Sequence, residues 1–592
     1  MKRCLPIPVG QNRLASKYGH FTPCRPATGG LKLLKTKLIY FAATITMLSL
    51  VVPCPLSSKT PAITEEFGEV PETATKGPLW HNELNHQAVL MATIDDGNLL
   101  VVTDSVGAVL CDAVTGATIW SLSELGGLTG ARWVPVPNRP LGCLLAGKTN
   151  SVYNRAARKN FDTYYNTLDM IDYRRGVVLW NSQRFGYKSV HGFFFLPPID
   201  GLLLYGRDSA MHTWSTAVSI ESGEILWRQD SLFGADGADL ISGFPETDHV
   251  INGQQSPVLD SDSTMIISVE LKFIRKVNIR TGTEIWRVKT RSNDVPSLVD
   301  GYAAAVYDSS RRAVYIPQGK MILGLRMDSG QPVWDTLPKL RGRAYQMQLV
   351  EQGLIVWGGP DPTKPSGHDY LTLVDLNTGK EIWSKPFTGL DHLKTSNFVV
   401  HQEQVWTFSK GKFWSVNLAD GAATMTTNVL EFGDDEFWPS LEFRDSAFLV
   451  TGTNTIARVR VDGTPLFAAM FKAPPPQFGM ADVLTIVVVA ASVASVVAAA
   501  TSPNGGYYYY PTSIQSPPSP QATTRKSNYV YILTNVRDDT NRKPGLVKVN
   551  RWTRSPEAAV KLDDRNPRYA TDQNTNRLFY AREGHLVECY EF

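Results

Sequence analysis

The sequence of 592 residues predicts an all-β propeller, a ring of small antiparallel sheets, and three observations support this prediction. A pattern of strand, turn, strand and closing tryptophan recurs through the chain, as in "LVDLNTGKEIW" at residues 373–383. Six of these tryptophans follow one another at intervals of 47 to 60 residues, close to the period of propeller blades. Forty-six glycines and 37 prolines suit a chain of many short strands and turns.

The closing tryptophan of each repeat is expected to fill the space between neighbouring blades, because a single blade cannot bury both of its faces. Near the start of the repeat region, "GPLW" carries a tryptophan without a strand of its own before it. We expect it to be an outer strand that completes the last blade and so closes the ring. The predicted docking tryptophans are Trp80, Trp120, Trp180, Trp227, Trp286, Trp334 and Trp383.

A glycine precedes each repeat tryptophan in the hairpin, where a tight turn requires a positive φ. Asp112, Asp172 and Asp375 stand just before that turn, where a short carboxylate can accept hydrogen bonds from free turn amides. The glycines assigned to the repeat are Gly116, Gly176, Gly223, Gly282, Gly330 and Gly379.

The intervals between tryptophans also hold further strand-like runs, such as "YQMQLV" and "GLIVWGG", so each blade should have four strands. Counting repeat ends from Trp120 to Phe467 gives eight. We therefore expect eight four-stranded blades in residues 75–592, with seven to ten compatible because the chain after Asn528 still alternates like strands. The longer intervals before Trp180 and Trp286 predict extended loops there.

The N-terminal region has the order of a secretory signal. Residues 1–37 form a basic flank with eight Lys/Arg and no acid, and residues 38–58 are uncharged and largely apolar. We expect a signal peptide or an uncleaved membrane anchor, with the rest of the chain outside the cytosol. Without the flank the chain carries 51 basic and 56 acidic residues, which excludes a nucleic-acid-binding charge distribution.

A second apolar segment interrupts the repeats at residues 474–527. It contains an uncharged run from Val483 to Ala500 (483–500), followed by a tyrosine cluster at 507–510. A membrane-spanning segment here would place the last strands on the wrong side of a membrane, so the ring could not close. A lid that contacts the membrane or a partner, and a helix packed on the propeller's own face, both remain open.

Other short motifs are expected to be structural. "GCLLAGKT" (142–149) matches the letters of a phosphate-binding P-loop, but its apolar centre falls where the second strand of a blade is due. Asp369 and Asp391 each stand beside a histidine in turn-like sequence, which predicts solvated side chains. "LDSDSTM" around Asp260 lacks the glycine and the closing glutamate of a calcium loop. We expect no metal, and the cysteines beyond the N-terminal region should be buried singly.

The D-x-x-T-G-x-x-x-W pattern resembles the docking repeat of pyrroloquinoline quinone (PQQ) propellers over about residues 80–592. That family includes quinoprotein alcohol dehydrogenases and non-catalytic members, such as the propeller lipoprotein of the bacterial outer-membrane assembly machine. The resemblance implies that an enzyme would stack its quinone on a disulfide between adjacent cysteines, but this sequence has no Cys-Cys pair. It therefore favours the non-catalytic branch and no cofactor.

The sequence thus predicts an exported, bacterial, cell-envelope propeller that binds a protein or a small envelope ligand on one face, with contact to the membrane through 483–500 as an additional hypothesis. No catalytic residues are assigned. The alternative is a PQQ-dependent dehydrogenase.

Overall fold

The computed structural model describes most of residues 64–592, which contain β-strands and short 3₁₀ turns. The longer stretches outside the described residues are 1–63, 233–257, 290–304, 360–367, 429–438, 473–507 and 510–522, with shorter breaks elsewhere. The basic flank, the predicted signal or anchor and the apolar run 483–500 therefore lie outside them. Within the described residues, no helix is long and apolar enough to span a membrane.

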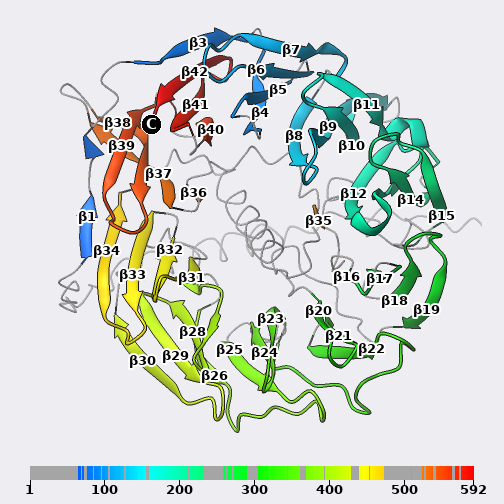
Figure 1. Cartoon of the computed structure of the whole chain (residues 1–592), viewed down its shortest axis with the longest axis vertical. Helices are drawn as coiled ribbons and strands as arrows, with labels where there is room; N and C mark the ends of the chain where they lie inside the picture. Colours follow the sequence, from blue (N-terminus) through cyan, green and yellow to red (C-terminus); the bar gives the residue numbers. More distant parts are fainter. Residues whose placement is uncertain are drawn as a thin grey trace, which may run out of the picture. The chain divides into compact units, whose positions relative to one another are not determined.

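Ten small sheets follow one another along the chain, and Figure 1 shows them arranged as a ring. In several sheets the first strand of the meander lies nearer the centre of the ring and the last lies on the outside (Figure 1). The prediction of an all-β propeller is confirmed. The best estimate of eight blades is wrong, although ten lies within the expected range of seven to ten, because the chain after residue 528 forms two further sheets and contains no tryptophan of the repeat type.

The first three sheets are antiparallel meanders of consecutive strands. They consist of β4 (Ala88–Thr93), β5 (Leu99–Thr103), β6 (Gly107–Cys111) and β7 (Thr118–Leu122); β8 (Leu128–Pro135), β9 (Leu141–Asn154), β10 (Lys159–Asp172) and β11 (Val177–Asn181); and β12 (Ser189–Leu196), β13 (Gly201–Arg207), β14 (Thr213–Ser219) and β15 (Ile225–Asp230). Three 3₁₀ turns, η1 (Ser123–Leu125), η2 (Ser182–Phe185) and η3 (Pro197–Ile199), connect strands here.

The fourth and fifth sheets consist of β16 (Val258–Leu259), β17 (Thr264–Val269), β18 (Phe273–Asn278) and β19 (Glu284–Lys289); and β20 (Val306–Asp308), β21 (Ala313–Gln318) and β22 (Met321–Arg326). The fifth sheet departs from the four-strand prediction. Its outer strand is reduced to a bridge between Leu325 and Pro332 and a bond from Val333 N–H to the Gly324 carbonyl.

The next three sheets consist of β23 (Ala344–Val350), β24 (Gly353–Gly358), β25 (Asp369–Val374) and β26 (Phe387–Leu390); β27 (Val399–His401), β28 (Gln404–Ser409), β29 (Lys412–Asn417) and β30 (Ala423–Asn428); and β31 (Ser440–Arg444), β32 (Ala447–Thr451), β33 (Thr455–Arg460) and β34 (Pro465–Phe471). The last two consist of β37 (Tyr529–Arg537), β38 (Arg542–Asn550) and β39 (Pro556–Lys561); and β40 (Arg568–Asp572), β41 (Arg577–Arg582) and β42 (Leu586–Glu591).

Strands from distant parts of the chain complete several of these sheets. β1 (Thr64–Phe67) and β2 (Val70–Pro71) pair in parallel with β34 and β37. β3 (Trp80–Glu83) pairs antiparallel with β42 and supplies the fourth strand of the last sheet. This is the position expected for the isolated "GPLW" segment, and it links the two ends of the ring.

The hydrophobic core is divided among the interfaces between sheets. Ten clusters of buried apolar side chains each join two neighbouring sheets, including the pair formed by the first and the last. In the cluster that closes the ring, Leu99, Val101 and Cys111 of the first sheet pack with Phe579 and Val587 of the last. Each sheet therefore depends on both neighbours for the burial of its faces.

Candidate functional site

Each predicted docking tryptophan reaches from its own sheet to the next one. The indole Nε1 donates a hydrogen bond to a backbone carbonyl that lies between 33 and 53 residues further along the chain. The seven donor–acceptor pairs are Trp80–Ala113, Trp120–Tyr173, Trp180–Ile220, Trp227–Ile279, Trp286–Met327, Trp334–Leu376 and Trp383–Leu418, at distances of 2.6 to 3.0 Å.

The repeat glycines lie directly beside these indoles. Their φ angles lie between 63° and 74° for all six residues, Gly116, Gly176, Gly223, Gly282, Gly330 and Gly379. A Cβ on Gly116 would lie 2.5 Å from the ring of Trp80, and one on Gly223 would lie 2.6 Å from Trp180. The sequence indicated only the turn requirement, whereas the structure adds a second one: the neighbouring indole occupies the space where a side chain would be.

The aspartates before the turns accept hydrogen bonds from turn amides, as expected. Asp375 Oδ1 accepts from the N–H groups of Asn377 and Thr378 at 3.1 and 2.6 Å, and also from the Thr378 hydroxyl. These hydrogen bonds stabilise the carboxylate, and the hydroxyl of Thr378 contributes most to lowering the pKa of Asp375. Asp112 and Asp172 bond their turns in the same way. The groups that carry the repeat pattern are thus engaged within the ring.

The P-loop-like stretch is part of a strand. All of residues 142–149 belong to β9, and the backbone pairs with β8 on one side and β10 on the other through residue 148. A P-loop needs free backbone amides that surround phosphate groups. In β9 the amides are used in a ladder, so the structural interpretation of this motif is confirmed.

The hairpin of β9 and β10 extends well beyond its sheet. Its strands pair continuously from Leu141 and Asp172 to Asn154 and Lys159. β8 accompanies β9 only as far as Lys148, and β11 accompanies β10 only over residues 169–172. The remaining six pairs, from Thr149 onward, form a two-stranded ribbon roughly 20 Å long. This ribbon accounts for the long interval before Trp180.

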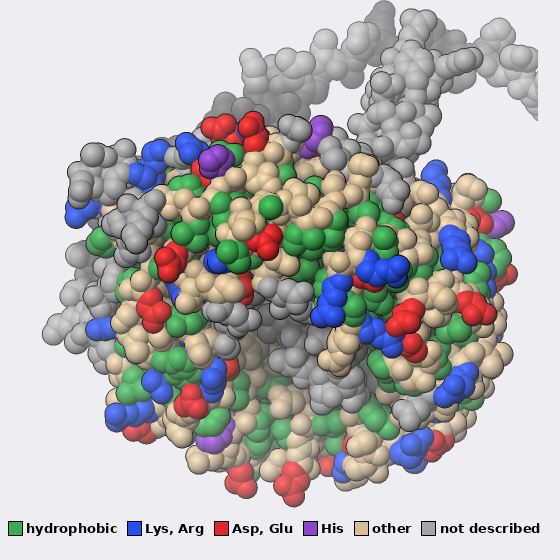
Figure 2. Space-filling model, turned by 45° about the horizontal axis from the view of Figure 1, so that its top comes forward, with side chains coloured by type: hydrophobic (Ala, Val, Ile, Leu, Met, Phe, Trp, Pro, Cys, Tyr) green, Lys and Arg blue, Asp and Glu red, His purple; other side chains and the backbone are tan. Residues whose placement is uncertain are grey.

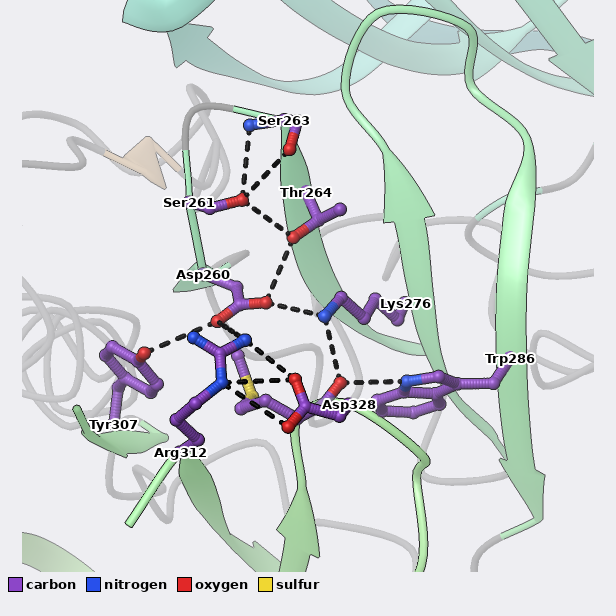
Figure 3. Close-up of polar contacts among 10 residues, drawn as sticks. Asp260, Ser261, Ser263, Thr264, Lys276, Trp286, Tyr307, Arg312 and Asp328 are labelled. Atoms are coloured by element: carbon purple, nitrogen blue, oxygen red, sulfur yellow. Dashed lines mark hydrogen bonds and ion pairs between the residues drawn. The ribbon is translucent and has the colours of Figure 1, made fainter. Parts of the chain in front are cut away.

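A cluster of charged side chains lies between the fourth and fifth sheets (Figure 3). Asp260 follows β16, and its Oδ2 accepts hydrogen bonds from Lys276 Nζ at 2.6 Å and Thr264 Oγ1 at 3.0 Å. Its Oδ1 accepts from the Tyr307 hydroxyl at 3.3 Å and lies 3.7 Å from Arg312 Nη2. The side chains of Asp260 and Lys276 are only 1% and 7% exposed.

The same cluster connects to a docking tryptophan and to the surface. Lys276 Nζ and Trp286 Nε1 both donate to the Met327 carbonyl, at 2.9 and 3.0 Å. On the solvent side, Arg312 bonds Asp328 at 2.8 Å, and this hydrogen bond lowers the pKa of the Asp328 carboxyl. Both oxygens of Asp260 accept donors within the protein, so the geometry suits a link between two sheets rather than a general base.

A second buried carboxyl was missed at the sequence level. Asp369 begins β25 and is 3% exposed, so the expected solvated turn is wrong. Burial raises the pKa of Asp369 to about 7, the negative charge of Asp391 adds to the rise, and Trp357 and Lys410 oppose it. Lys410 pairs with Asp391 at 3.0 Å. The sequence did contain a signal for this burial. In an alternating strand, Asp369 lies on the same face as residues 371 and 373, which are apolar.

Two short strands of the 474–527 segment pair with strands of the propeller itself. β35 (Tyr508–Tyr509) pairs antiparallel with Phe194 and Phe193 of β12, the innermost strand of the third sheet. β36 (Thr523–Arg525) pairs with the start of β37. The tyrosine cluster that the sequence assigned to an interface therefore has two residues in contact with the chain's own backbone.

The described residues contain no group of three or more His, Cys, Asp or Glu side chains that could hold a metal ion. Cys111, Cys143 and Cys589 are buried and not disulfide-bonded. Burial raises the pKa of Cys111 to about 11.

Figure 2 shows one face of the molecule, where basic, acidic and apolar side chains are interspersed. Charge does not single out a binding surface among the described residues of that face.

One known protein family matches the sequence of this chain. The family model described as outer membrane protein assembly factor BamB matches residues 67–268 and 165–427, which together span more than half of the chain. No curated protein matches the sequence. Two similar solved structures are BamB from Moraxella catarrhalis (14% identity, TM-score 0.33, covering 65% of this chain and 97% of that one) and the computationally designed Ika8 protein (11%, 0.32, 66% and 98%).

Proposed function

Because the chain belongs to the BamB-like family of PQQ-repeat β-propellers, we propose that it is a bacterial cell-envelope protein that acts as a binding or assembly scaffold for other envelope proteins. The family match carries this proposal, since its description names an assembly factor of the outer membrane. A scaffold role needs a rigid frame and a surface for partners. It requires no catalytic group.

The structure supports the two parts of this role with different residues. The docking tryptophans and the cluster at Asp260 bond neighbouring sheets to each other, and so they serve the frame. The ribbon of β9 and β10 extends past its own sheet and departs from the repeat. We place the partner-binding surface there.

The proposed location rests on the N-terminal sequence. The basic residues of 1–37 followed by the uncharged 38–58 are typical of export, by a cleaved signal or an uncleaved anchor. The chain has no Asn-x-Ser/Thr sequence, which agrees with a bacterial rather than a eukaryotic secretory origin. Contact with the membrane through 483–500 is a separate part of the proposal.

The cofactor in the family's name does not fit the residues of this chain. The quinoprotein enzymes use a disulfide between adjacent cysteines, whereas Cys111, Cys143 and Cys589 are far apart in sequence. Among the described residues, two buried carboxyl groups come closest to forming a reactive site. Asp260 is paired with Lys276, and Asp369 is enclosed by protein.

The test combines cell fractionation, cross-linking and a redox assay. We expect the full chain in the envelope fraction, and a protein cross-linked to it there should in turn capture the chain when it is used as bait. The control is a dye-linked alcohol oxidation assay with added PQQ and Ca²⁺. Robust turnover in that assay, or a cytosolic location, would contradict the scaffold proposal.

A further inference from the structure

A surface depression lies at one end of the eighth sheet, apart from the β9–β10 ribbon of the second sheet. Its volume is about 500 Å³, and the turns between β31 and β32 and between β33 and β34 contribute to its lining, as do Arg458 and Arg460 of β33. Most of its lining residues are exposed, so the depression is open to solvent. It suits a side chain presented by another protein better than a small molecule, because ligand pockets usually enclose most of their ligand.

The boundary between the eighth and ninth sheets, beside this depression, departs from the docking repeat. Phe467 stands where the other repeats have a tryptophan, and it is buried among residues of both sheets. Its side chain has no N–H, so it cannot donate the hydrogen bond that the docking indoles donate. The hairpin between β38 and β39 carries Trp552, and the Cζ atoms of Arg444 and Arg458 lie 5.1 and 4.8 Å from the centroid of its ring. Arg458 is therefore held at the boundary by an aromatic contact.

Arg458 carries a charge without a counterion in the described parts of the chain. Its Nε is buried and has no hydrogen-bond partner there. The contact with Trp552 is the electrostatic contact that its guanidinium makes among those residues. Arg444, which contacts the same ring, differs because its Nε lies 3.6 Å from the Asp445 carboxylate. Charged groups that are partly withdrawn from water are normally paired, so an external anion would complete the surroundings of Arg458.

The contact with Trp552 leaves Arg458 suited to a carboxylate. An indole covers a face of the planar guanidinium, and the N–H groups on its edge can still donate. Two of them can form parallel hydrogen bonds to one carboxylate. Arg460 lies two residues further along β33, on the same side of the strand, and also lines the depression. The depression thus offers two positive charges to one ligand.

The remaining lining residues narrow the choice of anion. Asp445 and Asp462 belong to the lining, and Asp462 Oδ1 accepts a hydrogen bond from the Thr464 N–H at 2.8 Å. These two carboxylates repel a phosphate group, which carries about −1.5 to −2 charges, more strongly than a singly charged carboxylate. Leu466, which is 36% exposed, and Val461 add apolar surface. The lining therefore fits an acidic side chain that has apolar neighbours.

We propose that the depression beside Arg458 binds an aspartate or glutamate side chain, flanked by apolar residues, of a partner protein. This inference rests on the proposed scaffold function, and it assigns a second contact surface and the chemistry of the partner. Arg458 donates hydrogen bonds to the carboxylate, and Arg460 adds attraction. Leu466 and Val461 contact the apolar neighbours of the acid.

The probe is the peptide Gly-Leu-Glu-Leu-Gly, blocked at both ends and labelled with an uncharged fluorophore. The full chain in non-ionic detergent is titrated into it, and anisotropy reports binding. We expect saturable binding that weakens as salt rises, because salt screens exposed charges. Gly-Leu-Gln-Leu-Gly, which lacks only the charge, should bind about ten-fold more weakly or less well still. Equal binding of the two peptides, or binding of neither, would contradict the proposal.

Two arginines that contact the same indole provide a matched comparison. Arg458→Gln should weaken binding of the glutamate peptide by about ten-fold or more. Arg458→Lys, which keeps the charge but loses the planar fork, should recover only part of the affinity. Arg444→Gln should leave the affinity within about two-fold of the natural chain, because Arg444 contacts Trp552 but does not line the depression. Equal losses from Arg444→Gln and Arg458→Gln would overturn the assignment of the carboxylate to Arg458.

A gain of binding provides a result that a misfolded variant cannot produce. Asp462→Asn removes a negative charge from the lining but keeps the oxygen that accepts from the Thr464 N–H. It should tighten binding of the glutamate peptide by about two- to three-fold and leave the glutamine peptide unchanged. Binding of the glutamate peptide that is unchanged or weaker in Asp462→Asn would count against an acidic ligand at this site.

Three further results would also overturn the inference. One is inorganic phosphate that binds the natural chain more tightly than the glutamate peptide does, because the ligand would then be a phosphate group. Another is a dimer that Arg458→Gln disrupts, which would make a second copy of the chain the occupant. The third is a reciprocal envelope cross-link that persists unchanged in Arg458→Gln. In that case the scaffold function stands and only this surface is wrongly assigned, whereas a cytosolic location of the natural chain contradicts the scaffold function itself.

Discussion

The ammonium of Lys276 lies 2.6 Å from the Asp260 carboxylate, and both side chains are almost fully buried between two sheets. Lys276 also bonds the Met327 carbonyl, which accepts from the docking indole of Trp286 as well. At this interface the repeat contact and a buried ion pair share one acceptor.

The first prediction concerns this ion pair. Asp260→Asn should lower the free energy of unfolding by roughly 3–5 kcal/mol, because it leaves the Lys276 charge buried without its counterion. Asp328→Asn removes the carboxylate that pairs with Arg312 at the surface; Asp328 is 69% exposed, so this variant should leave the free energy of unfolding almost unchanged. Urea unfolding of the three proteins measures both values. Similar losses from the two variants would contradict the role assigned to the buried pair.

The second prediction concerns the docking tryptophans. Trp383 is 2% exposed and bonds the Leu418 carbonyl of the next sheet at 2.8 Å. Trp383→Ala should cost roughly 3–5 kcal/mol of stability, the range for emptying a buried aromatic site. Lys380→Ala in the same hairpin should have almost no effect, because that side chain is exposed. Equal melting temperatures would show that the indole does not hold the sheets together.

The third prediction separates the two constraints on the repeat glycines. Gly421 and Gly186 both have positive φ, at 74° and 78°. A Cβ on Gly421 would lie 2.7 Å from Trp383, whereas one on Gly186 would meet nothing within 4 Å. Gly186→Ala should cost about 1–2 kcal/mol for its left-handed backbone alone, and Gly421→Ala about 1–3 kcal/mol more because of overpacking. Thermal unfolding gives the comparison, and equal costs would leave φ as the only constraint.

The fourth prediction is a pH dependence from Asp369. Its pKa is raised from 3.8 to about 7 in the folded protein, so the folded state binds more protons than the unfolded state between about pH 4 and pH 7. The contribution of Asp369 to stability should therefore fall as pH rises through this range and then level off. At about 1.4 kcal/mol per pKa unit, the total change is up to ~4 kcal/mol.

Asp369→Asn tests this prediction, because an amide does not titrate. The variant should lose the Asp369 part of the slope and should be more stable relative to the natural protein at pH 8 than at pH 5. Asp391→Asn is the matched comparison, since it removes the negative charge that raises the pKa of Asp369 while leaving Asp369 in place. Denaturant unfolding at several pH values measures both. An unchanged slope in Asp369→Asn would assign the effect to other groups.

The fifth prediction concerns the 474–527 segment. Replacing residues 478–520 with a short Gly/Ser linker should leave the ring folded, because loop entropy changes slowly with length. It keeps β36 on β37 but removes β35, so the one amide of the Phe193–Phe194 pair that faces β35 should exchange faster with solvent. Chains lacking residues 1–60, with and without the segment, should differ in liposome flotation if 483–500 contacts a membrane. Unfolding on removal of the segment would instead make it part of the core.

The sequence by itself determined the repeat and therefore the class of fold. A docking unit is local: the aspartate, the turn glycine and the tryptophan lie within about ten residues, so their pattern is visible in a single hairpin. The apolar centre of 142–149 and its place in the repeat likewise predicted a strand rather than a phosphate-binding loop. The same reasoning extended to the first strand, because a tryptophan without its own hairpin needs a sheet elsewhere to complete.

The tertiary structure decided the features that depend on which sheets meet. The number of sheets is set by closure between the ends of the chain, and the chain after residue 528, which forms the last two sheets, contains no repeat tryptophan to count. The neighbour of each repeat glycine is an indole from the preceding sheet, and the partners of Asp260 come from two sheets. Burial of Asp369 follows from the packing of its strand against the next sheet. Contacts between distant residues fix all of these, and a local pattern cannot encode them.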